Sequence, residues 1–410
     1  MKTGCPEDVL DWLKPGSRVF FQSGPGECQA FIDLFKANPG AGKGVELWSC
    51  LIPGVNTFDY GSLPDGPTLV TFMASPTLAP SIASGRTRID AMPYSEIGVT
   101  LGQTDFDLAI LHVAPPDAEG LCSFGISAEV GRIVSPRSKQ RIAFINKRMP
   151  SVAGDALATG DIDLAIEIDE PLLAAAASSR TATTNAFARH AAALVPEYAT
   201  IQSGIGDAPG VIIAALTSHK RLRIHSGLVT PEYRLLAESG ALDPDRYHVA
   251  GIAWGDRDFY DWLPDSGITF RSVRETHFHE RLASIPNFVS IGSALEVDLE
   301  GAINLEWLGD RRVSSVGGAP DFMHGAAASP GGRSIIALPS QTRSGASRIV
   351  PRLGKYSIPA ALADAIVTEH GVAELRGLSA RARADALIAI AAPDHQGVLA
   401  AAAGATMGNP

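Results

Sequence analysis

The chain of 410 residues carries a formal net charge of −10, and its residues are 45% hydrophobic and 19% charged. This length predicts two domains, and this composition is typical of a well-buried globular protein. The negative charge, without a basic stripe, argues against a nucleic-acid-binding surface.

Segments that would target the chain to a membrane are not expected. The N-terminus lacks the apolar region of a signal peptide, and no apolar run reaches the roughly 18 residues that span a bilayer. The four cysteines are scattered without CxxC spacing, which predicts neither a zinc site nor a disulfide framework. We therefore expect a soluble, reduced, cytoplasmic protein with no membrane or nucleic-acid partner.

The first part of the chain alternates short apolar strands with helix-length segments. The expected strands are residues 18–21, 45–48, 68–72, 108–113 and 141–145. The run 108–113 is nearly all apolar, as strands buried on both faces are. Strands separated by helical stretches indicate βαβ units and a mostly parallel sheet.

A linker-like stretch divides the chain. Residues 170–184 read EPLLAAAASSRTATT, without periodicity, and we place the domain boundary there. The α/β alternation then resumes, with expected strands at 222–225, 247–252, 288–291, 334–338 and 365–367. We predict two open α/β domains with mostly parallel sheets, covering residues 1–184 and 185–410.

One stretch of the second domain combines a strand, a glycine turn and a helix start. An apolar run at 198–201 leads into Gly204-Ile205-Gly206, and a helix-like segment follows at 211–216. In this arrangement, backbone N–H groups and a helix N-terminus can face an anion, often a phosphate. The turn lacks the third glycine of a dinucleotide fingerprint, and a plain structural turn has the same spacing.

Further candidates lie downstream of this turn. The next expected strand brings His225-Ser226-Gly227 to the crevice that the glycine turn faces. The pair Gly317-Gly318 can expose backbone donors to an oxyanion or form a tight turn. Glu296 and Asp298 share one face of a strand, which suits acid–base work, but a solvent-facing strand gives the same alternation and is the favoured interpretation.

Two other groups are weaker candidates. His277 and His279 would share a face of an extended segment, but no third ligand is evident, so no metal site is predicted. Cys122 has no basic neighbour that would lower its pKa, which favours an inert thiol over a nucleophile.

Together and in this order, several segments resemble the acetyl-CoA hydrolase/transferase family, the single-chain class I CoA-transferases that include 4-hydroxybutyrate/acetate CoA-transferases. The segments are VAPPDAEGLCSFGIS, INKRMP, SGIGDAPG, ALEVDLEGAIN, SVGGAPDF, SIIALPSQTRSGASRIVPRL and VTEHGVAELRG. The resemblance implies a CoA-transferase-like fold with the acyl-CoA site between two α/β domains. It also implies which residues bind CoA, and these are Gly204, Ile205, Gly206, Gly317, Gly318 and Arg343, the last in place of a family lysine.

The usual chemistry of the resembled family is a ping-pong transfer through a glutamate. The glutamate attacks the acyl-CoA, an acyl anhydride forms, and CoA then forms a thioester with the glutamate; a carboxylate suits this because it is both nucleophile and leaving group. The position that matches this glutamate is Gly227, which has no side chain to form the thioester. The position that matches a family amide, usually Asn, is His277.

Three functions follow as alternatives. The first is transfer of CoA between an acyl-CoA and a small carboxylate such as acetate, with Glu296 or Glu306 as the nucleophile in place of the family glutamate. The second is acyl-CoA hydrolysis, with water at Gly227 activated by His277, because an imidazole that titrates near neutral pH suits that role. The third is non-catalytic binding of an acyl-CoA. The expected cofactor is coenzyme A as substrate thioester, without a metal, and the expected assembly is a homodimer.

Overall fold

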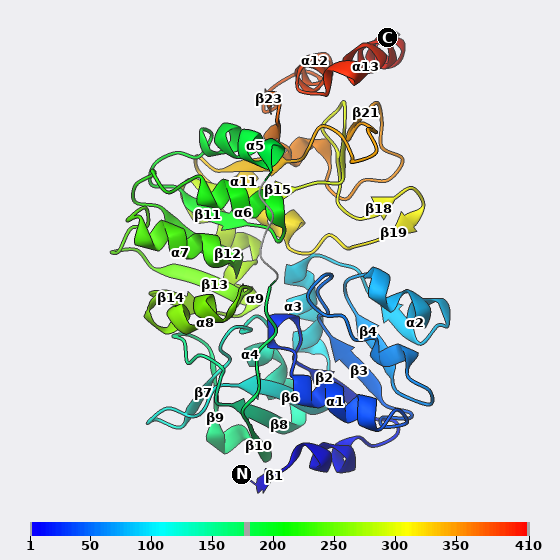
Figure 1. Ribbon diagram of the computed structural model, residues 1–410, viewed down its shortest axis with the longest axis vertical. Helices are drawn as coiled ribbons and strands as arrows, with labels where there is room; N and C mark the ends of the chain where they lie inside the picture. The colour runs from blue at the N-terminus through cyan, green and yellow to red at the C-terminus, as the bar shows by residue number, and fades with distance from the viewer. Residues whose placement is uncertain (1, 176–180, 408–410) are drawn as a thin grey trace. The chain divides into compact units, whose positions relative to one another are not determined.

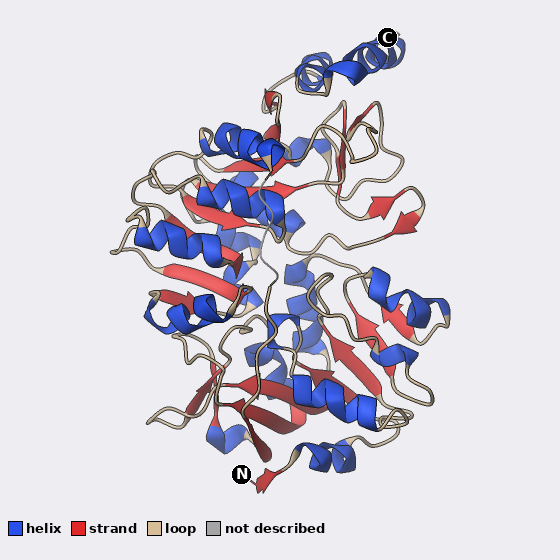
Figure 2. Ribbon diagram, viewed as in Figure 1, coloured by secondary structure: helices blue, strands red, loops and turns tan. Residues whose placement is uncertain are grey.

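A computed structural model describes residues 2–175 and 181–407 of the chain (Figures 1 and 2). The chain divides into two compact units. Unit 1 comprises Met1–Ala176, Tyr247–Thr276 and Val313–Gly317, and unit 2 comprises Ala177–Arg246, His277–Arg312 and Gly318–Pro410. Residues 176–180 of the predicted linker lie outside the described residues, and a domain boundary between residues 184 and 185 stays a prediction.

Unit 1 contains an eight-stranded sheet in which every neighbouring pair is parallel. Its order is β1-β10-β8-β6-β2-β3-β4-β5. The strands are β1 (Lys2–Gly4), β2 (Arg18–Phe21), β3 (Glu46–Ser49), β4 (Thr68–Thr71), β5 (Thr87–Ile89), β6 (Phe106–Val113), β8 (Ser138–Asn146) and β10 (Leu164–Ile168). All but one residue of β6 are buried, as its apolar run predicts for a strand covered on both faces.

Further elements complete unit 1. Two smaller pairings join β7 (Leu121–Ser123) to β9 (Ala156–Ala158), antiparallel, and β13 (His248–Ala253) to β14 (Ile268–Phe270), parallel. The α-helices are α1 (Gln29–Ala37), α2 (Ala79–Ala83), α3 (Tyr94–Gln103), α4 (Gly131–Val134), α8 (Arg257–Trp262) and α9 (Val273–Thr276). The 3₁₀ helices are η1 (Pro6–Trp12), η2 (Gly24–Gly26), η3 (Tyr60–Ser62), η4 (Pro76–Leu78), η5 (Ser135–Arg137), η6 (Thr159–Asp161) and η7 (Leu263–Asp265).

Aromatic side chains fill part of the unit 1 core. Phe31 and Phe35 lie one turn apart on α1, so both point to the face of the helix that is buried. Their rings lie 5.9 and 5.4 Å from that of Tyr60, and Phe21 of β2 lies 4.7 Å from it. Each such pair adds roughly 0.5–1.5 kcal/mol beyond area burial. The amphipathic period of α1 is therefore what attaches this helix to the sheet.

Unit 2 contains a second mostly parallel sheet, in the order β12-β11-β15-β20-β22-β23, with only the last pair antiparallel. Its strands are β11 (Thr200–Ser203), β12 (Arg223–Val229), β15 (Phe288–Ser293), β20 (Arg333–Ala337), β22 (Ala365–Thr368) and β23 (Gly371–Glu374). Shorter strands are β16 (Glu296–Asp298), β17 (Ile303–Asn304), β18 (Trp307–Leu308), β19 (Arg311–Arg312) and β21 (Ile349–Val350).

The helices of unit 2 are α5 (Ala182–Ala192), α6 (Asp207–Ala214), α7 (Pro231–Glu238), α10 (His279–Ala283), α11 (Ala319–Ala328), η8 (Ala360–Leu362), α12 (Ala380–Ala389) and α13 (Pro393–Met407). Several of them lie beside the strands, whereas α12 and α13 extend beyond the sheet at the C-terminal end (Figures 1 and 2). Helices α5, α6 and α7 lie side by side in Figure 1. The predicted α/β class with mostly parallel sheets is confirmed. In the described part of the chain, no helix is both long and apolar enough to cross a membrane.

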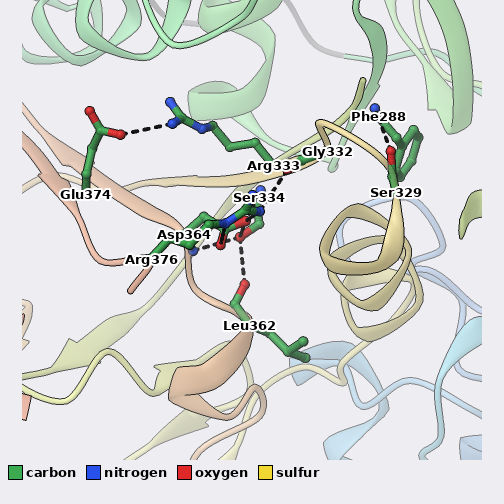
Figure 3. A network of polar contacts seen from close by, with 9 residues as sticks. All are labelled: Phe288, Ser329, Gly332, Arg333, Ser334, Leu362, Asp364, Glu374 and Arg376. Carbon is green, nitrogen blue, oxygen red and sulfur yellow. Dashed lines mark hydrogen bonds and ion pairs between the residues drawn. The ribbon is translucent and has the colours of Figure 1, made fainter. Parts of the chain in front are cut away.

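A buried carboxylate ties two strands of unit 2 together (Figure 3). Asp364, at the start of β22, accepts hydrogen bonds from the guanidinium of Arg376 at 2.7 and 2.6 Å. It also accepts one from the backbone N–H of Ser334 on β20, at 2.9 Å. The paired geometry satisfies both carboxylate oxygens, which is the condition under which a buried charge is tolerated. The nearby pair Arg333–Glu374, at 2.9 Å, has a glutamate side chain that is 61% exposed.

Candidate functional site

The glycine turn of unit 2 has the predicted strand–turn–helix geometry. Strand β11 ends at Ser203, and α6 begins at Asp207, with Gly206 as its N-cap residue. Gly206 has φ of +120°, a conformation that side-chain-bearing residues rarely adopt. The N–H of Gly204 is bonded to the carbonyl of Ile291 on β15 at 2.9 Å, which fixes the start of the turn. The first N–H groups of α6 therefore follow a turn that only glycine forms without strain.

Strand β12 lies beside β11, so the segment His225-Ser226-Gly227 runs next to the glycine turn. The pairing is parallel, with Thr200 opposite Arg223. Ser226 is buried, and its Oγ donates to the carbonyl of Leu228 at 2.6 Å. The predicted placement of this second strand is confirmed.

His277 lies against both predicted glycine positions of unit 2. A Cβ atom on Gly227 would be 2.7 Å from Cε1 of His277, and a Cβ on Gly318 would be 2.7 Å from its Nε2. The ring also lies 4.5 Å, centroid to centroid, from that of Phe322 on α11. The imidazole is 5% exposed. The imidazole of His277 thus packs against two glycines, Gly227 and Gly318, and one aromatic ring, that of Phe322. We call these four residues the imidazole cradle.

The imidazole of His277 does not titrate near neutral pH, so that sequence-based expectation is wrong. Burial lowers its pKa from 6.5 to about 3, with a smaller contribution from the charge of His225. Desolvation disfavours the imidazolium, because the cradle offers little water to solvate a cation. At pH 7 the ring is neutral and is a weak proton acceptor, which makes it a poor base for activating water.

The predicted carboxylates each have a defined partner. An Oε of Glu296 accepts a hydrogen bond from the side-chain amide of Asn304 on β17 at 2.9 Å. Glu306 is buried and accepts a hydrogen bond from the Arg312 guanidinium at 2.9 Å. Both acids are therefore tied to side chains of their own unit.

Asp298 does not face solvent, so the expectation of a solvent-facing strand is wrong at this residue. Its side chain is buried, and Oδ1 accepts hydrogen bonds from three successive backbone N–H groups, those of residues 300–302, at 2.9 to 3.1 Å. A carboxylate used in this way closes the turn between β16 and β17.

The remaining predicted CoA contacts lie in turns. Gly317 has φ of +57°, and Gly318 is the N-cap residue of α11. Arg343 is exposed, in a turn closed by the bond from Thr342 N–H to the carbonyl of Ala346 at 2.8 Å. Ile205 is 44% exposed at the tip of the glycine turn. Their roles in binding CoA stay predictions.

Unit 1 holds two buried carboxyl groups that the sequence analysis did not find. Glu27 follows the carboxyl end of β2, and its two oxygens accept hydrogen bonds from Asn56 Nδ2 at 2.9 Å and Tyr60 OH at 3.1 Å. Glu129 is 2% exposed, and its carboxyl lies 3.0 Å from the Oγ of Ser127. Burial raises the pKa of both carboxyls, that of Glu129 to about 7. The signal that could have found Glu27 is its position directly after a parallel strand and a glycine turn.

We expect the stability difference between Glu129→Gln and the wild type to widen, in favour of the variant, as the pH rises. The pKa of Glu129 is raised from 4.5 to about 7, so between these values the folded chain holds a proton that the unfolded chain has released. This contribution to stability is complete below pH 4.5 and is lost as the pH passes through 7. Glutamine does not titrate, so the gap should grow by up to about 3 kcal/mol.

Urea denaturation at about pH 5 and about pH 8 measures this gap. Glu167→Gln is the control, because Glu167 is exposed on β10. A gap for Glu129→Gln that is equal at both pH values would contradict a buried carboxyl that titrates late.

Comparisons with known proteins agree with this geometry. The acetyl-CoA hydrolase/transferase C-terminal domain model matches residues 255–403. The 4-hydroxybutyrate coenzyme A transferase of Clostridium kluyveri is 34% identical over 299 residues, which cover 70% of this chain and 70% of that protein. The butyryl-CoA:acetate CoA-transferase of Anaerostipes caccae is 34% identical over 311 residues, covering 71% and 70%. The crystal structure of RipA from Yersinia pestis aligns with a TM-score of 0.92 at 27% identity, over 99% of this chain and 98% of that one.

The parallel sheets, the glycine turn and these likenesses define a protein of the CoA-transferase class. The chain belongs to the acetyl-CoA hydrolase/transferase family.

Proposed function

We propose that this protein transfers CoA between an acyl-CoA and a small carboxylate such as acetate, without an enzyme-bound thioester at residue 227. The relatives support the reaction class, because their names describe CoA transfer involving acyl-CoA and carboxylates. We also propose that CoA takes part as the thioester of the substrate. The protein works in the cytoplasm as a homodimer in this proposal. Sedimentation of the purified chain tests the dimer.

The observation that carries the proposal is the imidazole cradle. Residue 227 is glycine, and the space where its Cβ would begin is taken by the ring of His277. A covalent route through this position therefore lacks both the carboxylate and the room for it. The acceptor carboxylate itself can supply the missing chemistry, because a carboxylate is both nucleophile and leaving group.

The direct exchange balances without a proton. A carboxylate oxygen of the acceptor attacks the thioester carbon, the C–S bond breaks, and CoA leaves as a thiolate, which gives a mixed anhydride. The thiolate then attacks the acceptor-derived carbonyl carbon, and the donor acid leaves as a carboxylate. No step needs a general base, whereas hydrolysis must remove a proton from water. The low pKa of His277, about 3, therefore favours transfer over the water route.

Initial-rate kinetics test the proposal. We expect turnover of an acyl-CoA that depends on acetate, with double-reciprocal lines that intersect, because both substrates must be bound together. Parallel lines, with a trapped acyl or CoA adduct on Glu296 or Glu306, would show that the nucleophile has moved to another residue. Release of CoA at the same rate without acetate would favour hydrolysis, and CoA binding without any turnover would favour a binding protein.

The same proposal assigns CoA to the glycine turn, and Gly206→Ala should weaken CoA binding by about tenfold, or about 1.4 kcal/mol. No atom lies within 4 Å of a Cβ at this position, so the expected loss comes from the backbone, whose φ of +120° alanine resists. The N–H groups at the start of α6 would then turn away from the phosphates. Calorimetric titration with CoA measures the affinity.

Gly309→Ala is the matched control, because Gly309 also has a positive φ, +59°, and open space around its Cβ. It lies between β18 and β19, outside the glycine turn. Unchanged CoA affinity in Gly206→Ala, or an equal loss in both variants, would refute the assignment.

A further inference from the structure

Unit 1 contains a cavity of about 390 Å³ beyond the carboxyl ends of two neighbouring parallel strands. One wall is residues 147–150, directly after β8, and another is Pro171, Leu172 and Ala174, shortly after β10. The third comes from α8 and η7. Ligands of open α/β sheets bind at the carboxyl ends of the strands, and small-molecule sites have volumes of about 300–1,000 Å³. Position and size both fit a small-molecule site.

The charges around this cavity are mostly positive, although the chain as a whole carries −10. Lys147, Arg148 and Arg257 line it, with Asp261 as the only acid in the lining. Arg148 is paired with Asp169 at 2.6 Å, and Arg257 with Asp261 at 3.4 Å. Within the described ranges the ammonium of Lys147 has no salt bridge within 4 Å, and it acts on Asp169 only by a longer-range attraction that helps to lower the pKa of that carboxyl. The cavity therefore has a cation available for an anionic group.

The rest of the lining is apolar. It consists of Met149, Pro150, Pro171, Leu172, Ala174, Pro264 and the ring of Tyr260. Covering such a surface with an apolar body removes both from water, which is favourable. A bare inorganic anion would leave this surface in contact with water. The lining thus matches a molecule with an anionic group on an apolar body.

The walls are held in place without a ligand. The hydroxyl of Tyr260 donates to the carbonyl of Leu173 at 3.0 Å, and the N–H of Ala175 is bonded to the carbonyl of Gly255 at 2.9 Å. The turn after β8 is fixed by buried Asn146, whose Oδ1 accepts from the N–H of Arg148 at 3.0 Å. Binding would therefore need little ordering of the protein, which lowers its entropic cost.

We propose that this cavity binds a small organic anion, a carboxylate or a phosphate monoester on an apolar body, with Lys147 and Arg257 as its charge partners. The inference does not depend on the proposed transfer reaction, since every lining residue belongs to unit 1, whereas the glycine turn and the imidazole cradle belong to unit 2.

Titration of the full chain with 8-anilinonaphthalene-1-sulfonate, an anion on an aromatic body, tests the proposal by its fluorescence. Saturating CoA is present throughout, so that the CoA site is occupied. We expect Lys147→Met and Arg257→Gln each to weaken binding by about fivefold, the effect of losing one exposed charge contact. Leu172→Trp, which fills the cavity, should abolish the CoA-insensitive signal. Lys43→Met is the control, because Lys43 is an exposed lysine of unit 1 that is paired with Asp65.

Competition then identifies the anionic group. Displacement of the dye by benzoate, by phenyl phosphate or by both supports the proposal and tells the two chemistries apart, provided that neutral benzamide does not displace it. Equal dye affinity in the wild type and Lys147→Met would overturn the proposal. So would displacement by benzamide as well as by the anions, or the failure of both anions to compete.

Discussion

Gly227→Glu alone should not form a covalent CoA adduct, whereas Gly227→Glu combined with His277→Asn should form one. In the single variant the new Cβ would be 2.7 Å from His277 Cε1 and 3.2 Å from Phe322 Cζ. Overpacking of this kind costs about 1–3 kcal/mol and displaces the new side chain. Asparagine is smaller than histidine, and it is the residue that the family resemblance places at this position. The double variant therefore regains both the carboxylate and the room for it.

The measurement combines trapping with thermal unfolding. Each variant is incubated with acyl-CoA and treated with borohydride or hydroxylamine, and mass spectrometry then locates the modified peptide. His277→Asn alone is the control, since it opens the cradle without adding a nucleophile. If Gly227→Glu alone forms the adduct with unchanged stability, the imidazole moves aside freely and does not close the position. If the double variant folds but forms none, the groups around the thioester have also diverged, which favours a binding protein.

Asp364→Ala should lower the free energy of unfolding by about 1–3 kcal/mol. The substitution leaves the Arg376 guanidinium without its two carboxylate bonds, and the N–H of Ser334 on β20 loses its acceptor. The Arg376 side chain is 55% exposed, so water solvates its charge in the variant. Most of the loss therefore comes from the buried N–H of Ser334, which is left without an acceptor. Guanidinium chloride denaturation measures the loss.

Glu374→Ala is the control within the same group of side chains in Figure 3. Its partner is Arg333, and its side chain is 61% exposed, so the expected loss is below about 1 kcal/mol. Equal losses in the two variants would mean that burial does not set the strength of these pairs.

Strand order along the chain could be predicted because local patterns determine it. The run 108–113 is apolar at nearly every position and became the long, buried β6. The glycine turn was also predictable, since a strand, two glycines and a helix start are contiguous. Short edge strands such as β1 and β5 were not predicted, because three residues are too few to show a period.

The candidate site was predictable in its parts but not in its packing. Gly227, His277 and Gly318 were each singled out, yet nothing in the sequence indicates that one imidazole touches both glycines. Such contacts depend on tertiary structure, as does burial, which is the main cause that lowers the pKa of His277 to about 3. The buried carboxyls of unit 1 were missed for the same reason: Glu27, for example, contacts Asn56 and Tyr60 only in the folded chain.

The imidazole cradle also constrains how this protein can change over generations. His277 lies against both Gly227 and Gly318, so the effect of a substitution at either glycine depends on the residue at 277. A glutamate that arose at 227 alone would clash with the ring, and selection would act against it because of poor folding. The histidine would have to be replaced first, at a time when its loss brings no new chemistry. This order of events makes the change slow, so descendants of this protein are expected to retain both glycines and the histidine.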